Sequence, residues 1–313
     1  MTDVEALARQ LESWLGEPVA DLRRLTGGAS RETWSFTAGE HRRILQRDRA
    51  GAVRTGGGMP AEAALLPLAH AAGVPVPALI AADVTGDHTG SPSMVTAHVE
   101  GETIARRIQR DDRFAAARRR FAADVAAALA GIHAVEHEEV PGLVGGDQVG
   151  QFREIFDAFG EPHPAFELAF RWLEQHRPVS VGHGLVHGDF RLGNLLLDED
   201  GLVAVLDWEL AHVGDPMEDL GWLCVRAWRF GGDLPVGGLG TREALFEAYE
   251  ASSGSSVDPE VVRWWEVLGT LKWGIMCMIQ VSSHLLGHAR SVELAAIGRR
   301  VCENEYDLME LLR

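Results

Sequence analysis

Residues 185–222 read LVHGDFRLGNLLLDEDGLVAVLDWELAHVGDPMEDLGW, and this stretch decides the fold. It contains two short apolar runs, at 195–197 and at 202–206, and the DEDG sequence between them has the composition of a tight turn. Two apolar runs joined by turn residues predict a β-hairpin. Such a hairpin would bring the residue that follows the second run close to the residue that precedes the first.

Three polar side chains flank this predicted hairpin: Asp189, Asn194 and Asp207. Carboxylate and amide oxygens are the hard ligands that Mg²⁺ prefers. Transfer of a nucleotide's terminal phosphate requires Mg²⁺ and one carboxylate that orients the acceptor hydroxyl and receives its proton. The order and spacing of the three side chains therefore indicate a phosphoryl-transfer site.

A simpler interpretation exists for each residue alone, because Asp and Asn in turns usually cap or solvate the local backbone. The functional interpretation depends on the combination. His183 and His187 are four residues apart, which would suit a metal only on a helix, and the glycines at 182, 184 and 188 argue against one. We interpret His187 as a residue that organises the loop by bonding the backbone near Asp189.

The motifs HGDFRLGN, at 187–194, and LDWE, at 206–209, resemble those of the aminoglycoside phosphotransferase and choline kinase-like small-molecule kinases, which share the protein-kinase fold. The resemblance implies an α+β, bilobal, protein-kinase-like fold. A small antiparallel sheet lobe that binds nucleotide would occupy residues 1–97. A larger, mainly helical lobe with the catalytic and acceptor-binding groups would occupy residues 98–313.

The same resemblance implies a role for each matching residue. Asp189 would be the catalytic base, and Asn194 and Asp207 would bind Mg²⁺. The segment GDPMEDLGW, at 214–222, resembles the part of the family that follows the metal-binding aspartate. There Asp215 and Asp219 would be structural residues that hydrogen-bond the catalytic loop.

The N-terminal pattern predicts a helix at about 4–15 and then an antiparallel meander of strands at 22–26, 31–37 and 42–47. The turn Gly27-Gly28-Ala29-Ser30 joins the first two strands. The resemblance places this turn over the nucleotide phosphates, where Gly28 and Ser30 would donate hydrogen bonds. A hairpin turn without a ligand role fits the same residues equally well.

One position departs from the family pattern. The resemblance pairs Glu62, at the start of a predicted helix at 61–72, with a lysine or arginine on the third strand that also holds the phosphates. The best register places Gln46 there, and Gln46 carries no charge. Either Arg47 takes over or the phosphates are held differently. Thr96 and His98 lie in the segment that resembles the hinge, where adenine would bond the backbone.

The rest of the chain predicts helices. Apolar residues from Phe114 to Ile132 recur at helical spacing, and further helices are predicted at 164–176, 242–251, 259–286 and 291–312. The resemblance places the acceptor among helices near 142–176 and in the C-terminal bundle. The candidates for lining that site are Trp264, Trp265, Trp273 and Glu266, although packing is the favoured interpretation of aromatic residues on a buried helix.

Composition bounds the class of protein. The chain has 313 residues and a net charge of −17, which disfavours nucleic acids and anionic membranes as partners because both bind cationic surfaces. An acidic surface suits a cationic acceptor such as an aminosugar but also serves solubility alone. Three isolated cysteines and an acidic amphipathic start predict a reducing, cytoplasmic setting. Monomer and homodimer both remain open.

The sequence thus predicts a small-molecule kinase that uses Mg²⁺ and ATP, or GTP, to phosphorylate a hydroxyl group. The motif sequences most resemble those of the family branch found beside acyl-CoA dehydrogenase domains. Aminoglycosides, sugars, amino alcohols and hydroxyacyl compounds all remain candidate acceptors. A catalytically silent nucleotide-binding pseudokinase or scaffold is the main alternative. A metal-dependent phosphohydrolase would use the same aspartates, but it would not need the hinge or Glu62.

Overall fold

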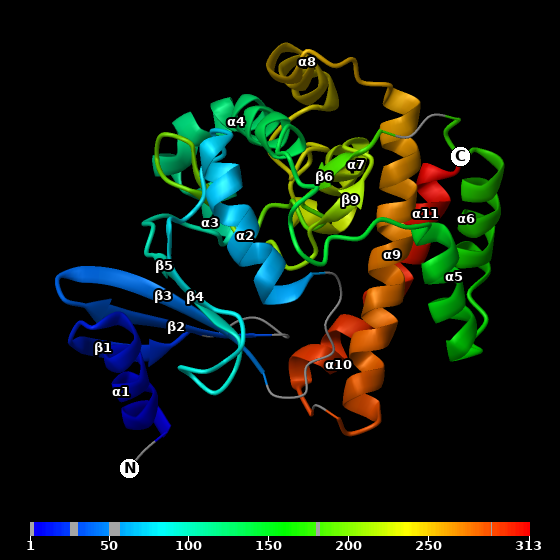
Figure 1. The fold of residues 1–313 in the computed structure, drawn as a ribbon. Helices are drawn as coiled ribbons and strands as arrows, with labels where there is room; N and C mark the ends of the chain where they lie inside the picture. The colour runs from blue at the N-terminus through cyan, green and yellow to red at the C-terminus, as the bar shows by residue number, and fades with distance from the viewer. Residues whose placement is uncertain (1–2, 26–30, 50–56, 180–181, 289) are drawn as a thin grey trace.

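The computed structural model describes residues 3–25, 31–49, 57–179, 182–288 and 290–313. A five-stranded antiparallel sheet forms the N-terminal part, and helices form most of the remainder (Figure 1). The predicted α+β class, with a small sheet lobe and a larger helical lobe, is confirmed. The boundary between residues 97 and 98 stays a prediction.

The N-terminal sheet has the strand order β1-β2-β3-β5-β4. Its strands are β1 (Val19–Arg24), β2 (Arg31–Ala38), β3 (His41–Asp48), β4 (Leu79–Asp83) and β5 (Ser93–Ala97). Successive side chains in a strand point to opposite faces, so Trp34, Phe36 and Leu45 share one face, where they pack with α1 (Asp3–Leu15). The other face of β2 and β3 carries Thr33 and Gln46, which are paired in register.

Helix α2 (Gly58–Ala71) connects the sheet to the helical part of the molecule. Its buried residues Met59, Leu65 and Leu66 belong to the largest core cluster, together with Phe121 and Leu129 of α4 (Ala115–His133). The short elements α3 (Ala105–Arg110) and η1 (Asp112–Phe114) precede α4. Glu62 is therefore held on a helix whose position both parts of the molecule fix.

Two small antiparallel pairs carry the motif-rich segment. Strand β6 (Gly184–Val186) pairs with β9 (His212–Gly214), and β7 (Leu195–Leu197) pairs with β8 (Leu202–Val205). The predicted hairpin is confirmed, and Asp198 closes its turn by accepting hydrogen bonds from the backbone N–H groups of Asp200 and Gly201. The loop between β6 and β7 contains both Asp189 and Asn194.

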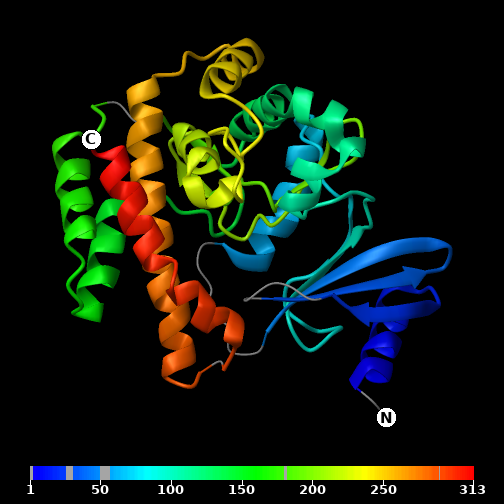
Figure 2. The same cartoon turned by 180° about the vertical axis from the view of Figure 1, so that it is seen from behind.

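A long helix, α9 (Pro259–Leu285), organises the C-terminal half, with α5, α6, α10 and α11 packed along it (Figure 2). The remaining elements are α5 (Gln148–Phe159), α6 (Pro164–Gln175), α7 (Met217–Cys224), η2 (Arg226–Arg229), α8 (Arg242–Ser253), α10 (Val292–Gly298) and α11 (Val301–Leu311). The single helix predicted at 291–312 is wrong in one respect, because a turn at Arg299 and Arg300 divides it. Trp264 and Trp265 are buried in the core between these helices, as the packing interpretation predicted.

Candidate functional site

Asp189 lies in the loop after β6, and its carboxylate is held by three side-chain donors. Oδ1 accepts hydrogen bonds from Nε of Arg191 (2.9 Å) and from Nε1 of Trp222 (3.0 Å). Oδ2 accepts one from Nδ2 of Asn194 (2.6 Å). The backbone N–H of Asp189 donates to Nδ1 of His187 over 3.2 Å, so His187 organises the loop as predicted. A carboxylate bound from several directions has one fixed orientation.

The amide of Asn194 has a defined orientation as well. Its Nδ2 donates to both the backbone oxygen (3.0 Å) and the Oδ2 of Asp189. A flipped amide would place its oxygen against two acceptors, so the network assigns the nitrogen to this side. The amide oxygen therefore points away from Asp189. The backbone oxygen of Asn194 accepts from the N–H of Leu206 (2.8 Å), which brings Asp207 alongside.

Asp207 combines a strained backbone with an unfavourable electrostatic environment. Its φ of 66° lies in the left-handed region, which non-glycine residues adopt rarely and at a cost. Burial raises the pKa of its carboxyl to about 7, and the negative charges of Glu209, Glu62 and Asp189 contribute further. Arg31 opposes this shift. The site thus holds more negative charge than its own residues neutralise.

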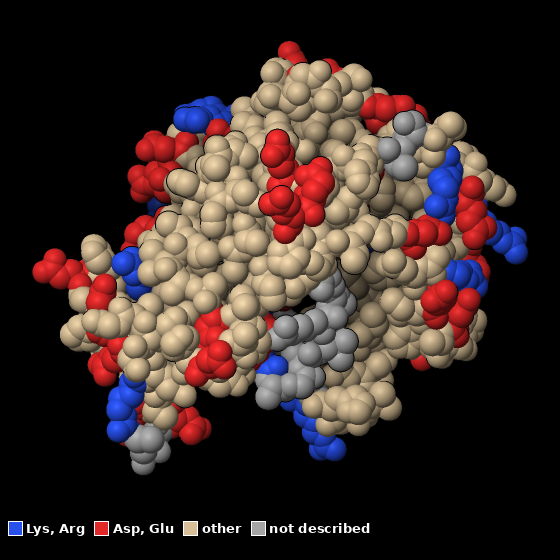
Figure 3. All heavy atoms as spheres, viewed as in Figure 1, with Lys and Arg blue, Asp and Glu red and all other residues tan. Residues whose placement is uncertain are grey.

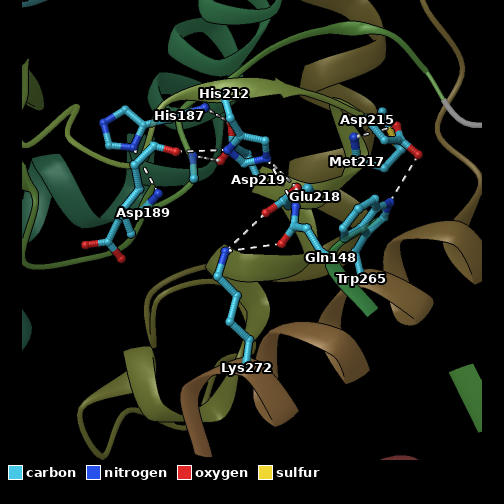
Figure 4. A network of polar contacts seen from close by, with 12 residues as sticks. Gln148, His187, Asp189, His212, Asp215, Met217, Glu218, Asp219, Trp265 and Lys272 are labelled. Carbon is cyan, nitrogen blue, oxygen red and sulfur yellow. Dashed lines mark hydrogen bonds and ion pairs between the residues drawn. The ribbon is translucent and has the colours of Figure 1, made fainter. Parts of the chain in front are cut away.

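Asp219, on α7, bonds the backbone of the loop that carries Asp189 (Figure 4). Its carboxylate accepts hydrogen bonds from the backbone N–H groups of His187 (2.8 Å) and Gly188 (3.0 Å) and contacts Nε2 of His133 at 3.2 Å. Burial alone would raise the pKa of Asp219, but these partners keep it below its usual value. The prediction that Asp219 bonds the catalytic loop is therefore confirmed.

Asp215 does not share this role. It accepts hydrogen bonds from the N–H of Met217 (3.0 Å), the first residue of α7, and from Nε1 of Trp265 (3.1 Å), so it attaches the start of α7 to α9 (Figure 4). The expectation that Asp215 bonds the catalytic loop was wrong. The physical reason is that α7 begins at Met217, where the first backbone N–H groups of the helix lack partners of their own.

A polar cluster, largely buried, lies beside the loop (Figure 4). Glu218 accepts a hydrogen bond from Gln148 (2.6 Å) and contacts Nε2 of His212 (3.0 Å) and Nζ of Lys272 (3.4 Å). Burial alone would raise the pKa of Glu218, yet Lys272 and His212 hold it below its usual value. Burial alone would lower the pKa of His212, and Glu218 raises it overall. The cluster connects β9, α5, α7 and α9.

A cavity of about 410 Å³ lies beside Asn194 and Asp207, between the sheet and the β7–β8 hairpin. The predicted binding residues Gln46, Glu62, Thr96 and His98 line it, and so do apolar residues from both sides: Leu25, Ile44, Leu66, Met94, Leu196 and Val205. Gly28 and Ser30 lie outside the residues that the structure describes.

Arg47 occupies the other face of the sheet. Its guanidinium bonds Glu32 (2.7 Å) and the backbone oxygen of Thr89 (3.2 Å). Because Leu45 packs against α1 and strand side chains alternate, Arg47 points to the α1 side. The structure thus brings Gln46 to the cavity and does not bring Arg47 to it.

Glu62 pairs with Arg31, the first residue of β2. The resemblance implied a partner on the third strand, and that expectation is corrected. Gln46 of β3 is uncharged, whereas Arg31 lies two residues before Thr33 on the same face of β2 and reaches Glu62 from there. The alternation of side chains along β2 places Arg31 on the same face as Thr33, but it does not show which residue Glu62 reaches.

A second cavity of about 990 Å³ lies in the helical part, between η2, α9 and α11. A chain of aromatic contacts joins it to Asp189: Trp222, which bonds Asp189, has its ring 5.1 Å from that of Trp228, and Trp228 lies 4.7 Å from Trp273. Trp273 lines the second cavity with Phe230, four arginines (Arg106, Arg226, Arg229 and Arg300) and three acidic residues. This cavity carries both signs of charge, as does the surface shown in Figure 3.

The donor set fits a magnesium ion. Asp207 is a partly buried carboxylate among other acidic groups, and Asn194 turns its amide oxygen away from Asp189. Among the described residues, no group of three or more His, Cys, Asp or Glu side chains is arranged to hold a metal. Magnesium often binds through one or two protein groups together with substrate phosphates and water, so Asn194 and Asp207 are sufficient protein ligands for it.

Comparisons with known proteins show which family the chain matches. Residues 21–265 match the model of a family described as "Phosphotransferase enzyme family". The chain is 45% identical over 64 residues to acyl-CoA dehydrogenase family member 10 of Mus musculus, and 42% identical over 60 residues to member 11 of Homo sapiens. These matches cover 20% and 18% of this chain, but only 6% and 8% of those proteins.

Three solved structures are similar over almost the whole chain. A Ralstonia eutropha protein provisionally assigned as an aminoglycoside phosphotransferase is 20% identical, with 97% of each chain covered and a TM-score of 0.75. A thermostable mutant of the aminoglycoside phosphotransferase APH(4)-Ia, in complex with ADP and hygromycin B, is 16% identical with 98% of each chain covered and a TM-score of 0.67. A choline/ethanolamine kinase family protein from Mesorhizobium loti is 17% identical, with 100% of this chain and 95% of that chain covered and a TM-score of 0.65. At these identities the likeness shows the fold. Within the described residues, no helix has both the length and the apolar character needed to cross a membrane.

Proposed function

The chain belongs to the phosphotransferase enzyme family, and from that membership we propose that it transfers the γ-phosphate of ATP or GTP to a hydroxyl group of a small molecule. The observation that carries the proposal is the geometry of Asp189, Asn194 and Asp207. One carboxylate is held in a fixed direction, and an amide oxygen and a second carboxylate lie beside it.

The nucleotide would occupy the first cavity. Its apolar lining from the sheet and from the β7–β8 hairpin suits the flat faces of a purine. The segment from Thr96 to His98 would offer backbone groups to the edge of the base. Asn194 and Asp207 line the same cavity, which would place the phosphates next to the magnesium ligands.

Asp189 would act on the acceptor. Its carboxylate would accept the proton of the acceptor hydroxyl while Arg191, Trp222 and Asn194 keep it in one orientation. Asn194 and Asp207 would hold Mg²⁺, which when bound offsets negative charge on the phosphates. The chain's own contribution is therefore orientation, proton acceptance and metal binding.

We propose the second cavity as a candidate acceptor site, because Trp273 in its lining is joined to Asp189 through the ring contacts of Trp228 and Trp222. Asp189 is not among the residues that line this cavity, so only the part of the acceptor remote from the reacting hydroxyl would occupy it. Arg106, Arg226, Arg229 and Arg300 in its lining, beside three acidic side chains, suit an acceptor that carries an acidic group better than a polycationic aminosugar. The acidic composition of the whole chain therefore does not extend to this cavity. We also propose a small-molecule partner and a cytoplasmic location.

The test is a transfer assay that measures ADP or GDP release with hydroxyl compounds of both charge signs. The purified chain is compared with Asp189→Asn, which keeps the shape of the side chain but removes the proton acceptor. Acceptor-dependent release by the wild type and its loss in Asp189→Asn are expected. Transfer that survives in Asp189→Asn would contradict the assignment of the base.

A further inference from the structure

The described lining of the first cavity contains acidic side chains but no lysine or arginine that would bind a phosphate. Glu62 and Asp207 both line it. The sequence has one lysine, Lys272, and its ammonium group is bound to Glu218 in the cluster beside the loop that carries Asp189. A nucleotide's phosphates need a cation that this wall of the cavity does not supply.

Arg31 is placed to supply it. Only 5% of its surface is exposed, and its side chain shares a face of the sheet with Thr33 and Gln46, which line the cavity. Nη1 binds Glu62, which lines the same cavity. Burial alone would lower the pKa of the guanidinium, but Glu62, Glu209 and Asp207 raise it overall. Arg31 therefore stays charged within the electric field of the metal-binding carboxylate.

The guanidinium also has hydrogen-bonding capacity left. Arginine has five N–H donors in a rigid fork, and Nη1 is the donor that bonds Glu62. Nε is buried without a hydrogen-bond partner, although it lies 3.3 Å from Oδ1 of Asp48 and 3.6 Å from Oε2 of Glu209. A buried arginine with an unsatisfied donor is costly, and a phosphate oxygen is an acceptor that suits its fork.

We propose that Arg31 of β2 binds the nucleotide phosphates while it holds Glu62, in place of a cation on β3. This inference rests on the proposed function. It accounts for the uncharged Gln46, because Gln46 pairs with Thr33, two residues from Arg31, and a second cation there would be repelled by the first. It also removes the main reason for regarding the site as silent.

The experiment measures dissociation constants of the purified chain for MgATP, MgADP and adenosine. In Arg31→Gln, loss of a charge-assisted contact should weaken MgATP and MgADP about tenfold or more. Adenosine, which has no phosphate, should bind as it does to the wild type. Arg24→Gln is the matched control: Arg24 lies on the same sheet and pairs with Glu32 at 3.1 Å, on the α1 face, so its loss should leave all three constants unchanged.

A double-mutant cycle separates direct contact from support of Glu62. Glu62→Gln removes the buried carboxylate that Arg31 neutralises. In this background, adding Arg31→Gln therefore leaves no unpaired negative charge at position 62. If Arg31 touches the phosphates, Arg31→Gln should still weaken MgATP about tenfold in this background. An unchanged MgATP constant there would overturn the proposal. A wild-type chain that binds neither MgATP nor MgGTP would instead contradict the proposed function itself.

Discussion

The indole Nε1 of Trp222 donates a hydrogen bond to Oδ1 of Asp189 over 3.0 Å. Trp222 belongs to α7, the helix whose Asp219 also holds the backbone of the loop at His187 and Gly188. One helix thus fixes both the chain around Asp189 and the direction of its carboxylate. Rigid support of this kind determines how well a catalytic group is oriented.

We expect Trp222→Phe to lower turnover about tenfold, because one of the donors that orient Asp189 is lost while most of the packing remains. The apparent affinity for MgATP should change little, since Trp222 is not among the residues that line the first cavity. Steady-state kinetics with a varied nucleotide concentration measure both quantities.

Trp264→Phe is the control for that variant. Trp264 is buried on α9 and also donates its indole N–H, in this case to the backbone oxygen of Leu173. Its loss should reduce stability without a selective effect on turnover of the folded enzyme. Equal turnover in both folded variants would show that the contact between Trp222 and Asp189 has no catalytic consequence.

Asp207→Asn should stabilise the apo protein and abolish phosphate transfer. Burial and neighbouring acids raise the pKa of Asp207 from 3.8 to about 7, so its ionised form costs stability once the pH exceeds the ordinary value. The cost grows between these two pKa values and is complete above the higher one, where it is about 4 kcal/mol.

The measurement is the free energy of unfolding of wild type and Asp207→Asn at pH 4 and pH 8, without metal. The variant's gain should be small at the lower pH and largest at the higher pH. A gain of the same size at both pH values would show that the ionised carboxylate of Asp207 does not cause the loss of stability in the wild type.

The contact between His212 and Glu218 should make stability depend on pH in a predictable direction. The folded-state pKa of His212 is raised above 6.5, so its stabilising charge is present below that value and is lost as the pH rises through the raised pKa. Glu218 has a pKa lowered from 4.5, so its contribution is lost only as the pH falls below that value.

His212→Gln should therefore destabilise the protein more at pH 6 than at pH 9. Chemical denaturation at the two pH values measures the difference. His41, which is exposed, provides the control. His41→Gln should change the stability only slightly, and by the same amount at both pH values. A larger loss for His212→Gln at pH 9 than at pH 6 would contradict the charged contact with Glu218.

Gly221→Ala should disrupt the contact between α7 and α9. A Cβ at this position would lie 2.6 Å from Cβ of Trp265 and 2.8 Å from the backbone N of Glu266. Neither atom can move without moving α9, so we expect a loss of about 3 kcal/mol in stability. Gly184→Ala, where the nearest atom would be 3.4 Å away, is the control and should cost less in thermal denaturation. Equal losses would contradict the close approach.

Local sequence patterns were sufficient for much of the fold. The turn composition between residues 197 and 202 and the apolar runs beside it predicted the hairpin that brings Asn194 and Asp207 together. Trp34 and Phe36, two residues apart on β2, share the face that packs on α1, as the alternation of strand side chains requires. These features depend on residues close in sequence, whose backbone preferences act directly.

Long-range pairings could not be predicted in the same way. The partner of Glu62 depends on how α2 sits against β2 and β3, and sequence spacing does not determine this, so Arg31 was missed. Asp215 and Asp219 lie four residues apart, but Asp215 bonds Trp265 of α9 and Asp219 bonds the loop at His187. They differ because α7 is packed between α9 and this loop. The turn at Arg299 and Arg300 that divides α10 from α11 likewise depends on packing, since Gly298 abuts Val281 of α9.

The most direct test of the central claim is calorimetric titration of the wild-type chain and Asp207→Asn with ATP and GTP, each with and without Mg²⁺. The account predicts that at least one nucleotide binds the wild type and that Mg²⁺ tightens the binding. In Asp207→Asn this magnesium-dependent gain should be lost. Binding of neither nucleotide to the wild type, or the same magnesium dependence in the variant, would contradict a phosphotransferase site built on Asn194 and Asp207.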